Sequence, residues 1–323
     1  KRPALARPFY LSMLVPSTTA FLFPGQGSQF VGMGRDLAES SPTAHHVFKT
    51  ADQLLGTNLS ALCWHGPVDE LNDTYNTQPA LYTCSLSALA ALRADVGDFT
   101  PAFAAGHSLG EITALAAVGS ISFQTGLKLV RERGRLMKIA GEREPGGMAA
   151  IIQLEQAKLV DICAQASAES DFEVQVANDN CPGQLVISGH SQLIDTVIQQ
   201  ARSAGARRAQ RLPISIAAHS PLMKSVASAF HEAVQLRTFG KPDAPIIANT
   251  TAEPIITEYA IRRELKDQLT AQVRWRESML YLLSEGITDF VELGPKNVLT
   301  GLLRRIEPTA NSHALGTPSA IAG

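Results

Sequence analysis

Cysteine is scarce in this chain of 323 residues, and the four that occur are scattered. They stand at positions 63, 84, 163 and 181, with no C-x-x-C pair among them. Structural zinc sites and the disulfide frameworks of small secreted proteins both need closely spaced or numerous cysteines. The sequence therefore predicts neither a metal site nor a disulfide scaffold, and we expect a reducing compartment, the cytoplasm.

Long apolar runs and an excess of one charge are also absent. No segment approaches the roughly 18 apolar residues of a membrane span. The 28 Lys and Arg residues face 30 Asp and Glu residues, so that the formal charge is −2. A nucleic-acid binder carries a basic excess, and this chain has none. We expect a soluble globular protein that binds neither membranes nor nucleic acid and holds no cofactor of its own.

The first 35 residues contain four basic residues and no acid, a bias that transit peptides share. In the alternative interpretation, residues 1–12 are upstream or added sequence and Met13 is a native start. The sequence favours the second interpretation.

Strand and helix patterns alternate along most of the chain, which indicates an α/β fold with a parallel sheet. The expected elements, in chain order, are a strand at 19–24, helices at 36–55 and 78–94, a strand at 101–105, helices from 111 and at 122–140, then, after about 220, a helix at 221–236, a strand at 244–250, helices near 258–270 and 275–285, a strand at 287–294 and a helix at 297–306. The tail after about 308 is expected to be a surface ending with one short strand near His313–Leu315.

The middle of the chain follows a different order, β-α-β-β-α-β, from residue 146 to about 214. This is the ferredoxin-like arrangement, which can close as a small domain of its own. We therefore expect a hydrolase-like large domain made of residues 13–142 and 220–310, interrupted by a ferredoxin-like small domain of residues 143–219.

The stretch GHSLGE places Ser108 between two glycines at the junction of a strand and a helix. A serine on such a sharp turn exposes its hydroxyl, and the glycines permit close backbone approach. On this interpretation Ser108 is a nucleophile and the N–H of Leu109 points at a developing oxyanion. The alternative is a helix-capping serine in a glycine turn.

A second oxyanion donor is expected from the glycine-rich loop PGQGSQ at 24–29, where we nominate the Gln26 amide; the alternative is a tight turn without a ligand. A serine nucleophile also needs a base, most often histidine. Of eight histidines, His219 leads because it lies where the chain leaves the small domain, and clefts form at such junctions. His107 adjoins the serine but is expected to pack or hydrogen-bond nearby. No acid has an obvious claim to orient His219, so a backbone carbonyl is an option.

Several motifs in register carry a resemblance to a known family. PGQGSQ, GHSLGE, RGRLM, NDNCPGQLVISG, AAHSPLM and VELGPKNVLTGLLRRI occur in an order that resembles the malonyl-CoA:acyl carrier protein transacylases and the acyltransferase domains of polyketide synthases. The resemblance covers residues from about 19 to 306. It implies that Ser108 is acylated, that His219 is the base, and that the amides of Gln26 and Leu109 form the oxyanion hole. It also implies that Arg133 pairs with the substrate's free carboxylate and that the main-chain carbonyl of Gln268 orients the histidine.

The resemblance further implies a coenzyme A thioester, malonyl-CoA, as substrate and a phosphopantetheinylated acyl carrier protein as partner, with the chain acting as a monomer. Because carrier proteins are acidic, a basic rim is expected among Arg207, Arg208, Arg211, Lys296, Arg304 and Arg305. The residues Ile216-Ala217-Ala218 before His219 match neither common family form, so malonyl or methylmalonyl selectivity stays open. An acyl hydrolase on the same scaffold and a non-catalytic docking module are the rival functions.

Overall fold

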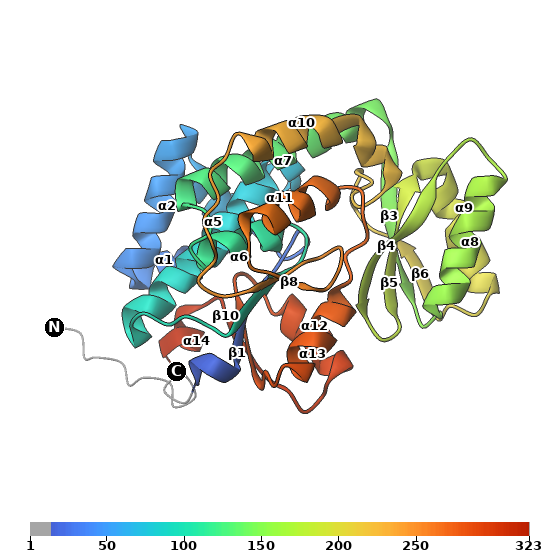
Figure 1. Ribbon diagram of the computed structural model, residues 1–323. Helices are drawn as coiled ribbons and strands as arrows, with labels where there is room; N and C mark the ends of the chain where they lie inside the picture. Colours follow the sequence, from blue (N-terminus) through green and yellow to red (C-terminus); the bar gives the residue numbers. More distant parts are fainter. Residues whose placement is uncertain (1–13, 323) are drawn as a thin grey trace.

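A computed structural model describes residues 14–322, and its strands form two separate sheets (Figure 1). The larger sheet has the order β10-β9-β1-β2-β7-β8. Its strands are β1 (Thr19–Phe23), β2 (Phe103–Gly106), β7 (Ile246–Ile247), β8 (Pro254–Ile255), β9 (Asp289–Leu293) and β10 (Asn311–Leu315). Every neighbouring pair is parallel except β7 with β8. The predicted α/β fold with a parallel sheet is confirmed; the antiparallel edge strand β8 has no clear signal in the sequence.

Helices surround this sheet, and none within residues 14–322 is long and apolar enough to cross a membrane. They are α1 (Arg35–Ser40), α2 (Pro42–Leu55), α3 (Leu59–His65), α4 (Val68–Asn72), α5 (Thr74–Val96), α6 (Leu109–Ala117), α7 (Phe123–Arg143), α10 (Lys224–Gln235), α11 (Glu258–Asp267), α12 (Trp275–Ser284), α13 (Val298–Ile306) and α14 (Pro318–Ala322), with 3-10 turns at Pro16–Thr18 and Pro221–Met223. The expected single helix at 36–55 is two helices, because Ser41 is extended and its side chain caps α2 through the Ala44 N–H. Helices α3, α4 and α14 were not expected from the sequence.

The alternation of side chains along β1 explains why both faces of the large sheet are covered. Phe21 and Phe23 point into the core formed with α2, α5, α6 and α7. Ala20 and Leu22 point to the opposite face, where they pack with residues of α12 and α13. Figure 1 shows these two helix layers on either side of the sheet. The carboxyl ends of β1 and β2 are thereby held rigidly side by side, in parallel register from Ala20 with Phe103 to Phe23 with Gly106.

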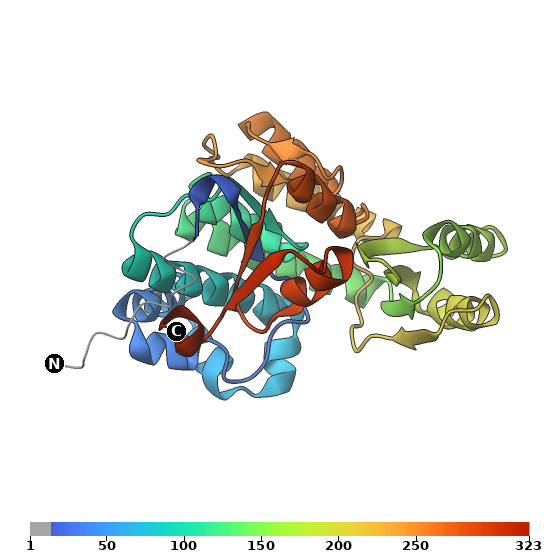
Figure 2. The ribbon, with the colours of Figure 1, turned by 90° about the horizontal axis from the view of Figure 1, so that it is seen from below.

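The smaller sheet is antiparallel throughout and has the order β4-β5-β3-β6. Its elements are β3 (Gly146–Ile152), α8 (Gln156–Ala168), β4 (Val174–Cys181), β5 (Gln184–His190), α9 (Ser191–Ser203) and β6 (Arg208–Arg211), so the expected β-α-β-β-α-β order is present. Strand β4 runs further than expected, because Ala177 and Asp179 exchange backbone hydrogen bonds with Val273 of the large unit. In the view from below, this sheet and its two helices project from one side of the molecule (Figure 2).

Only one face of the smaller sheet is covered by its own helices. Side chains such as Ile151, Ile187 and Val176 pack against α8 and α9. Met148, Ala177 and Val186 lie on the other face and pack with partly buried side chains of the chain segment at 212–218. This second face is turned toward the large unit, where it forms one wall of the cavity described next.

Candidate active site

A cavity of about 220 Å³ lies between the second face of the smaller sheet and the carboxyl ends of β1 and β2. Ligands of open α/β sheets bind at this edge. Its lining includes all of the predicted site residues except Gln268. The lining residues that concern the site are Gln26, His107, Ser108, Leu109, Arg133, Asn178, Asn180 and His219.

Ser108 sits on a sharp turn between β2 and α6, with φ 54° and ψ −109°. Such a conformation is costly for a residue with a Cβ and is found where the surroundings impose it. The two glycines of the motif allow the turn. A Cβ on Gly106 would lie 1.9 Å from the carbonyl carbon of Gly110, and one on Gly110 would lie 2.0 Å from the carbonyl oxygen of Phe23. The expected close backbone approach at both glycines is confirmed, and it directs the Ser108 hydroxyl into the cavity.

His219 contacts the serine directly, since its Nε2 lies 2.7 Å from Ser108 Oγ. Its Nδ1 lies 2.8 Å from the carbonyl oxygen of Gln268 and 3.1 Å from that of Ala271. Carbonyl oxygens only accept, so the neutral ring carries its proton on Nδ1 and leaves Nε2 as an acceptor for the serine O–H. Two backbone carbonyls thus occupy the place that an acid takes in many triads, as the missing acid suggested.

Burial, together with the positive charge of Arg133, lowers the pKa of His219 to about 3, against the two carbonyl hydrogen bonds. The ring is therefore neutral at physiological pH and ready to accept a proton. His107 does not compete for this position. Its Nε2 lies 2.9 Å from Asn180 Oδ1 and its ring packs against Trp275, as expected for a packed and hydrogen-bonded residue.

Arg133 is buried on α7 with its guanidinium facing the serine. Its Nη2 donates to Ser108 Oγ at 3.1 Å and to Gln268 Oε1 at 2.9 Å, and its Nη1 donates to Gln78 Oε1 at 3.0 Å. Burial lowers its pKa to about 10, so it remains charged at neutral pH. No carboxylate of residues 14–322 lies within 4.0 Å of it, and its buried Nε has no acceptor there. Glu111 acts on its charge from a distance but makes no ion pair with it, and a buried cation without a contacting anion is suited to bind one.

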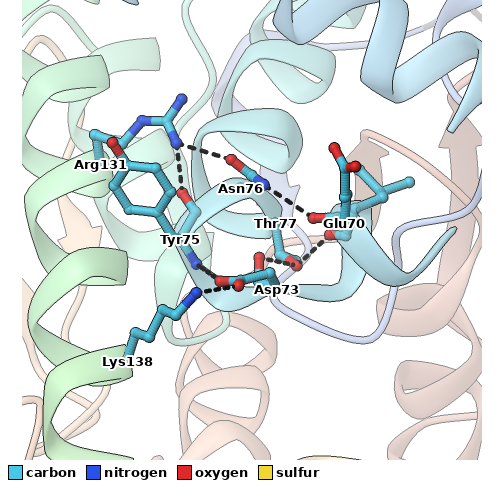
Figure 3. Close-up of polar contacts among 8 residues, drawn as sticks. Glu70, Asp73, Tyr75, Asn76, Thr77, Arg131 and Lys138 are labelled. Carbon is cyan, nitrogen blue, oxygen red and sulfur yellow. Dashed lines mark hydrogen bonds and ion pairs between the residues drawn. The ribbon is translucent and has the colours of Figure 1, made fainter. Parts of the chain in front are cut away.

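Arg131, two residues earlier on α7, lies elsewhere. Arg131 stacks on the Tyr75 ring at 4.0 Å and donates to the Tyr75 carbonyl and to Asn76 Oδ1 (Figure 3). In the same figure Lys138 pairs with Asp73 at the start of α5. These contacts hold α7 against the first turns of α5, from which Gln78 reaches Arg133.

The expected oxyanion donors also line the cavity. Leu109 is the first residue of α6, and Gln26 follows β1 in the glycine-rich loop. Within the described part of the chain, the backbone N–H of neither residue has a hydrogen-bond acceptor. Free N–H groups on a strand-end loop and at a helix N-terminus are suited to bind a negatively charged oxygen.

Sequence reasoning missed three residues that surround these groups: Gln78, Glu111 and Asn249. Asn249 Oδ1 accepts from the Ser108 N–H at 2.7 Å, and Glu111 accepts from Asn249 and from Gln268. The available signals were the acid inside GHSLGE and the asparagine just after β7, which neighbours β2 in the sheet. Gln78, in the middle of a buried helix, has no local signal.

The basic residues expected at the rim divide into three groups. Arg211 pairs with Asp195, so its charge is compensated. Arg305 donates to Gln184 Oε1, a lining residue of the cavity, and Lys296 donates to the carbonyl of Gly27, which lies between the lining residues Gln26 and Ser28. Arg207, Arg208 and Arg304 are exposed, with no ion-pair partner within residues 14–322.

Comparisons with known proteins agree with this geometry. Residues 20–323 match the family described as acyl transferase domain. A curated relative, the malonyl CoA-acyl carrier protein transacylase of Bacillus subtilis strain 168, is 41% identical over 305 residues, which cover 94% of this chain and 95% of the relative.

Two solved structures are similar along nearly their whole length. The malonyl CoA-acyl carrier protein transacylase of Coxiella burnetii has a TM-score of 0.91 at 38% identity, covering 95% of this chain and 96% of that one. A malonyl-transacylase in complex with a type II PKS acyl-carrier protein has a TM-score of 0.91 at 36% identity, covering 94% and 98%. The serine, histidine and arginine of the cavity thus lie in a chain whose sequence and fold both match the same group of enzymes, and the protein belongs to the acyl transferase domain family, as an acyltransferase.

Proposed function

We propose that this protein transfers a malonyl group from malonyl-CoA to the phosphopantetheine thiol of an acyl carrier protein, through an ester on Ser108. One observation carries the proposal. The Ser108 Oγ lies 2.7 Å from a neutral histidine nitrogen and 3.1 Å from a guanidinium nitrogen that has no carboxylate partner of its own. The first contact supplies a base for acyl transfer, and the second supplies a cation for an acyl group that carries a carboxylate.

In the first step, Ser108 Oγ attacks the thioester carbonyl of malonyl-CoA while His219 Nε2 takes the hydroxyl proton. The carbonyl oxygen becomes an oxyanion, which the N–H groups of Gln26 and Leu109 stabilise. The carbon–sulfur bond then breaks, and the departing coenzyme A sulfur receives the proton from His219. Ser108 is left as a malonyl ester, and no bound cofactor takes part.

The second step is the reverse reaction with a different thiol. The pantetheine thiol of the carrier gives its proton to His219 Nε2 and attacks the ester carbonyl. The carbon–oxygen bond breaks, and Ser108 Oγ regains the proton from His219. Throughout both steps the carbonyl oxygens of Gln268 and Ala271 keep the imidazole in one orientation and stabilise the imidazolium that forms.

The guanidinium of Arg133 would hold the free carboxylate of the malonyl group by charge-assisted hydrogen bonds. Within residues 14–322 it donates only to uncharged acceptors, the oxygens of Gln78, Gln268 and Ser108 and the Met137 sulfur, so a carboxylate would replace weaker partners. The same cation argues against the rival hydrolase of uncharged acyl groups, which would gain nothing from it. A non-catalytic docking module would not require a histidine tautomer that accepts the serine proton.

Selectivity between malonyl and methylmalonyl groups would be set by the segment before the histidine. Ile216 and Ala218 both line the cavity, whereas Ala217 is buried outside the lining. A small side chain at 218 leaves room for a branched acyl group. A methylmalonyl-selective enzyme is therefore the second form of this proposal.

The arrangement of the chain supports four further parts of the proposal. Residues 143–219 would form a domain inserted between 13–142 and 220–310, and the strand order β4-β5-β3-β6 supports a ferredoxin-like assignment for it.

The acidic carrier would dock on the basic rim around Lys296, Arg304 and Arg305 at the cavity mouth. The chain would act as a monomer, because every group used in the two steps belongs to one chain.

The direct test is mass spectrometry of the intact protein after incubation with malonyl-, methylmalonyl- or acetyl-CoA. We expect a carboxyacyl adduct on Ser108 that is absent in Ser108→Ala and that disappears when a phosphopantetheinylated carrier is added, with malonyl-carrier as product. An unlabelled wild-type protein would refute the proposal. Release of free malonate in place of malonyl-carrier would favour the hydrolase.

A further inference from the structure

The mechanism above leaves one buried acid of the site unused. Glu111 lies on α6 three residues after the nucleophile, and its side chain is only 1% exposed. Its Oε1 accepts from the backbone N–H of Asn249 at 2.8 Å and from Asn249 Nδ2 at 3.0 Å. Its Oε2 accepts from Gln268 Nε2. Three donors from two distant segments of the chain thus converge on one carboxyl group.

The two amide side chains that Glu111 binds each hold a different part of the site. Asn249 Oδ1 accepts from the Ser108 N–H at 2.7 Å, at the strained turn. Gln268 Nε2 donates to the Ser108 carbonyl at 3.0 Å, while Gln268 Oε1 accepts from Arg133 Nη2 at 2.9 Å. The backbone oxygen of Gln268 in turn accepts from His219 Nδ1. Nucleophile, base and carboxylate-binding cation are therefore all linked to Glu111 through one intermediate residue.

From this network we infer that Glu111 is a positioning residue, which fixes the orientation of the Asn249 and Gln268 amides and through them the placement of Ser108 and Arg133. An amide has a donor end and an acceptor end, and either can face a given neighbour. A carboxyl group that accepts at both oxygens selects the donor ends of both amides. The acceptor ends are then directed to the Ser108 N–H and to the Arg133 guanidinium. The inference rests on the proposed function, because it assigns Glu111 a part in that reaction.

A second buried acid, Glu264, acts on the charge of Glu111. Burial raises the pKa of Glu111 well above its ordinary value, and Glu264 raises it further. Burial also raises the pKa of Glu264, while hydrogen bonds from Thr250 and from Glu111 lower it. Hydrogen bonds from Asn249 and Gln268 and the charge of Arg133 oppose this rise, because each of them favours the carboxylate form of Glu111.

The test is Glu111→Gln, which has the same shape but carries an NH₂ group on one side. If this NH₂ faces Gln268 Nε2, two hydrogen-bond donors face each other. The Gln268 amide must then rotate by half a turn, which places its own NH₂ against the Arg133 guanidinium. If it faces Asn249, it meets two donors of that residue. We expect kcat/KM for malonyl-CoA to fall by about tenfold to a hundredfold, the range that follows from losing one hydrogen bond to a charged group. Preference over acetyl-CoA should fall with it, since the loss acts through Arg133.

The matched control is Glu292→Gln, which removes another buried carboxylate. Glu292 accepts from the backbone N–H groups of Leu299 and Thr300 at the start of α13 and has no contact with the amide network. We expect this variant to lose thermal stability while keeping the malonyl to acetyl preference of the wild type. Rates are normalised to the folded fraction, measured by circular dichroism, and Ser108 reactivity is followed separately with a fluorophosphonate probe.

The outcomes separate this inference from the function on which it rests. Failure of the wild type to form the acyl-serine would refute the proposed function. A wild type that reacts, together with a Glu111→Gln variant that keeps both its rate and its substrate preference, would overturn the inference alone. Glu111→Asp is the second variant, because it keeps the carboxyl group but is too short to reach both amides; rate and preference should fall in it as well. If neither Glu111 variant folds while Glu292→Gln does, Glu111 is a folding determinant and the inference is also overturned.

Discussion

At the scale of single residues, charge and burial separate the arginines of α7, which the sequence alone leaves similar. Arg133 is 1% exposed and faces the serine. Arg135 lies on the surface and pairs with Glu132 three residues away. A surface pair of this kind contributes little free energy, because water screens it. A buried cation is screened much less, so it attracts an anion that is bound next to it more strongly.

We expect Arg133→Ala to lower kcat/KM for malonyl-CoA by about tenfold or more, because hydrogen bonds to charged groups contribute roughly 1.5–3 kcal/mol each. The reaction with acetyl-CoA, which has no free carboxylate, should change far less. Competition assays with the two thioesters measure the preference directly. Arg135→Ala, on the same helix, should behave as the wild type, and an unchanged preference in Arg133→Ala would remove that residue from the site.

The pH dependence of acylation follows from the lowered pKa of His219. Burial brings this pKa to about 3, so the ring remains unprotonated, and able to act as a base, as the pH falls below 6.5. In kcat/KM, which reports the free enzyme, the acid limb should therefore lie well below pH 6.5. Stopped-flow measurement of coenzyme A release between pH 4.5 and 8 tests this. A midpoint at or above pH 6.5 would show that His219 titrates as an ordinary exposed histidine.

At the scale of secondary-structure elements, the site depends on close backbone contacts at the turn from β2 into α6. The Gly106 and Gly110 positions admit no side chain, because the nearest backbone atoms would lie within about 2 Å of a Cβ. The sequence motif predicts this feature, and the turn imposes a positive φ on the serine between the glycines.

Gly110→Ala should destabilise the protein by about 1–3 kcal/mol or more, the range for overpacking, because its Cβ would clash with the Phe23 carbonyl oxygen. Gly301→Ala is the matched control. Gly301 lies inside α13 with no atom near its missing Cβ, so alanine should stabilise that helix by roughly 0.5–1 kcal/mol. Chemical denaturation of the two variants gives both values. Equal effects on the free energy of unfolding would contradict the importance of the turn.

At the scale of the whole molecule, the site exists only because one face of the smaller sheet lies opposite the carboxyl ends of strands in the larger sheet. Ser108 and Arg133 come from the large unit, and Met148 and Asn178 of the smaller sheet close the opposite wall. Gln175 of β4 joins the two, since its Nε2 donates to the His219 carbonyl at 2.7 Å and to the Thr270 carbonyl at 3.1 Å. The smaller sheet thus supports the loop that carries the base as well as lining the cavity.

Reversal of charge on the cavity rim should separate the two half-reactions. In the double variant Lys296→Glu and Arg304→Glu, we expect KM for the carrier protein to rise and to lose part of its dependence on salt, since two attractive charges become repulsive. Acylation of Ser108 by malonyl-CoA serves as the internal reference, and it should change less than the transfer to the carrier. A KM for the carrier equal to that of the wild type would place the docking surface elsewhere.

The sequence by itself determined the strands and helices with strong periodicity, the serine turn and the interrupted α/β order, because each of these depends on residues that are neighbours in the chain. The sequence predicts the ends of elements less well where tertiary contacts override local preference. Strand β4, for example, extends to Cys181 and exchanges backbone hydrogen bonds with Val273. The roles of Arg133 and Gln268 came from the family resemblance and not from spacing.

Only the tertiary structure decided how the site groups are oriented. Ser108 and His219 are 111 positions apart, and Arg133 and Gln268 are 135 apart, yet each pair is within hydrogen-bond distance. The histidine tautomer, the lack of an ion pair at Arg133 among residues 14–322 and the convergence of two amides on Glu111 depend on which acceptors and donors folding brings together. No local pattern encodes them, because hydrogen bonding and desolvation act between neighbours in space.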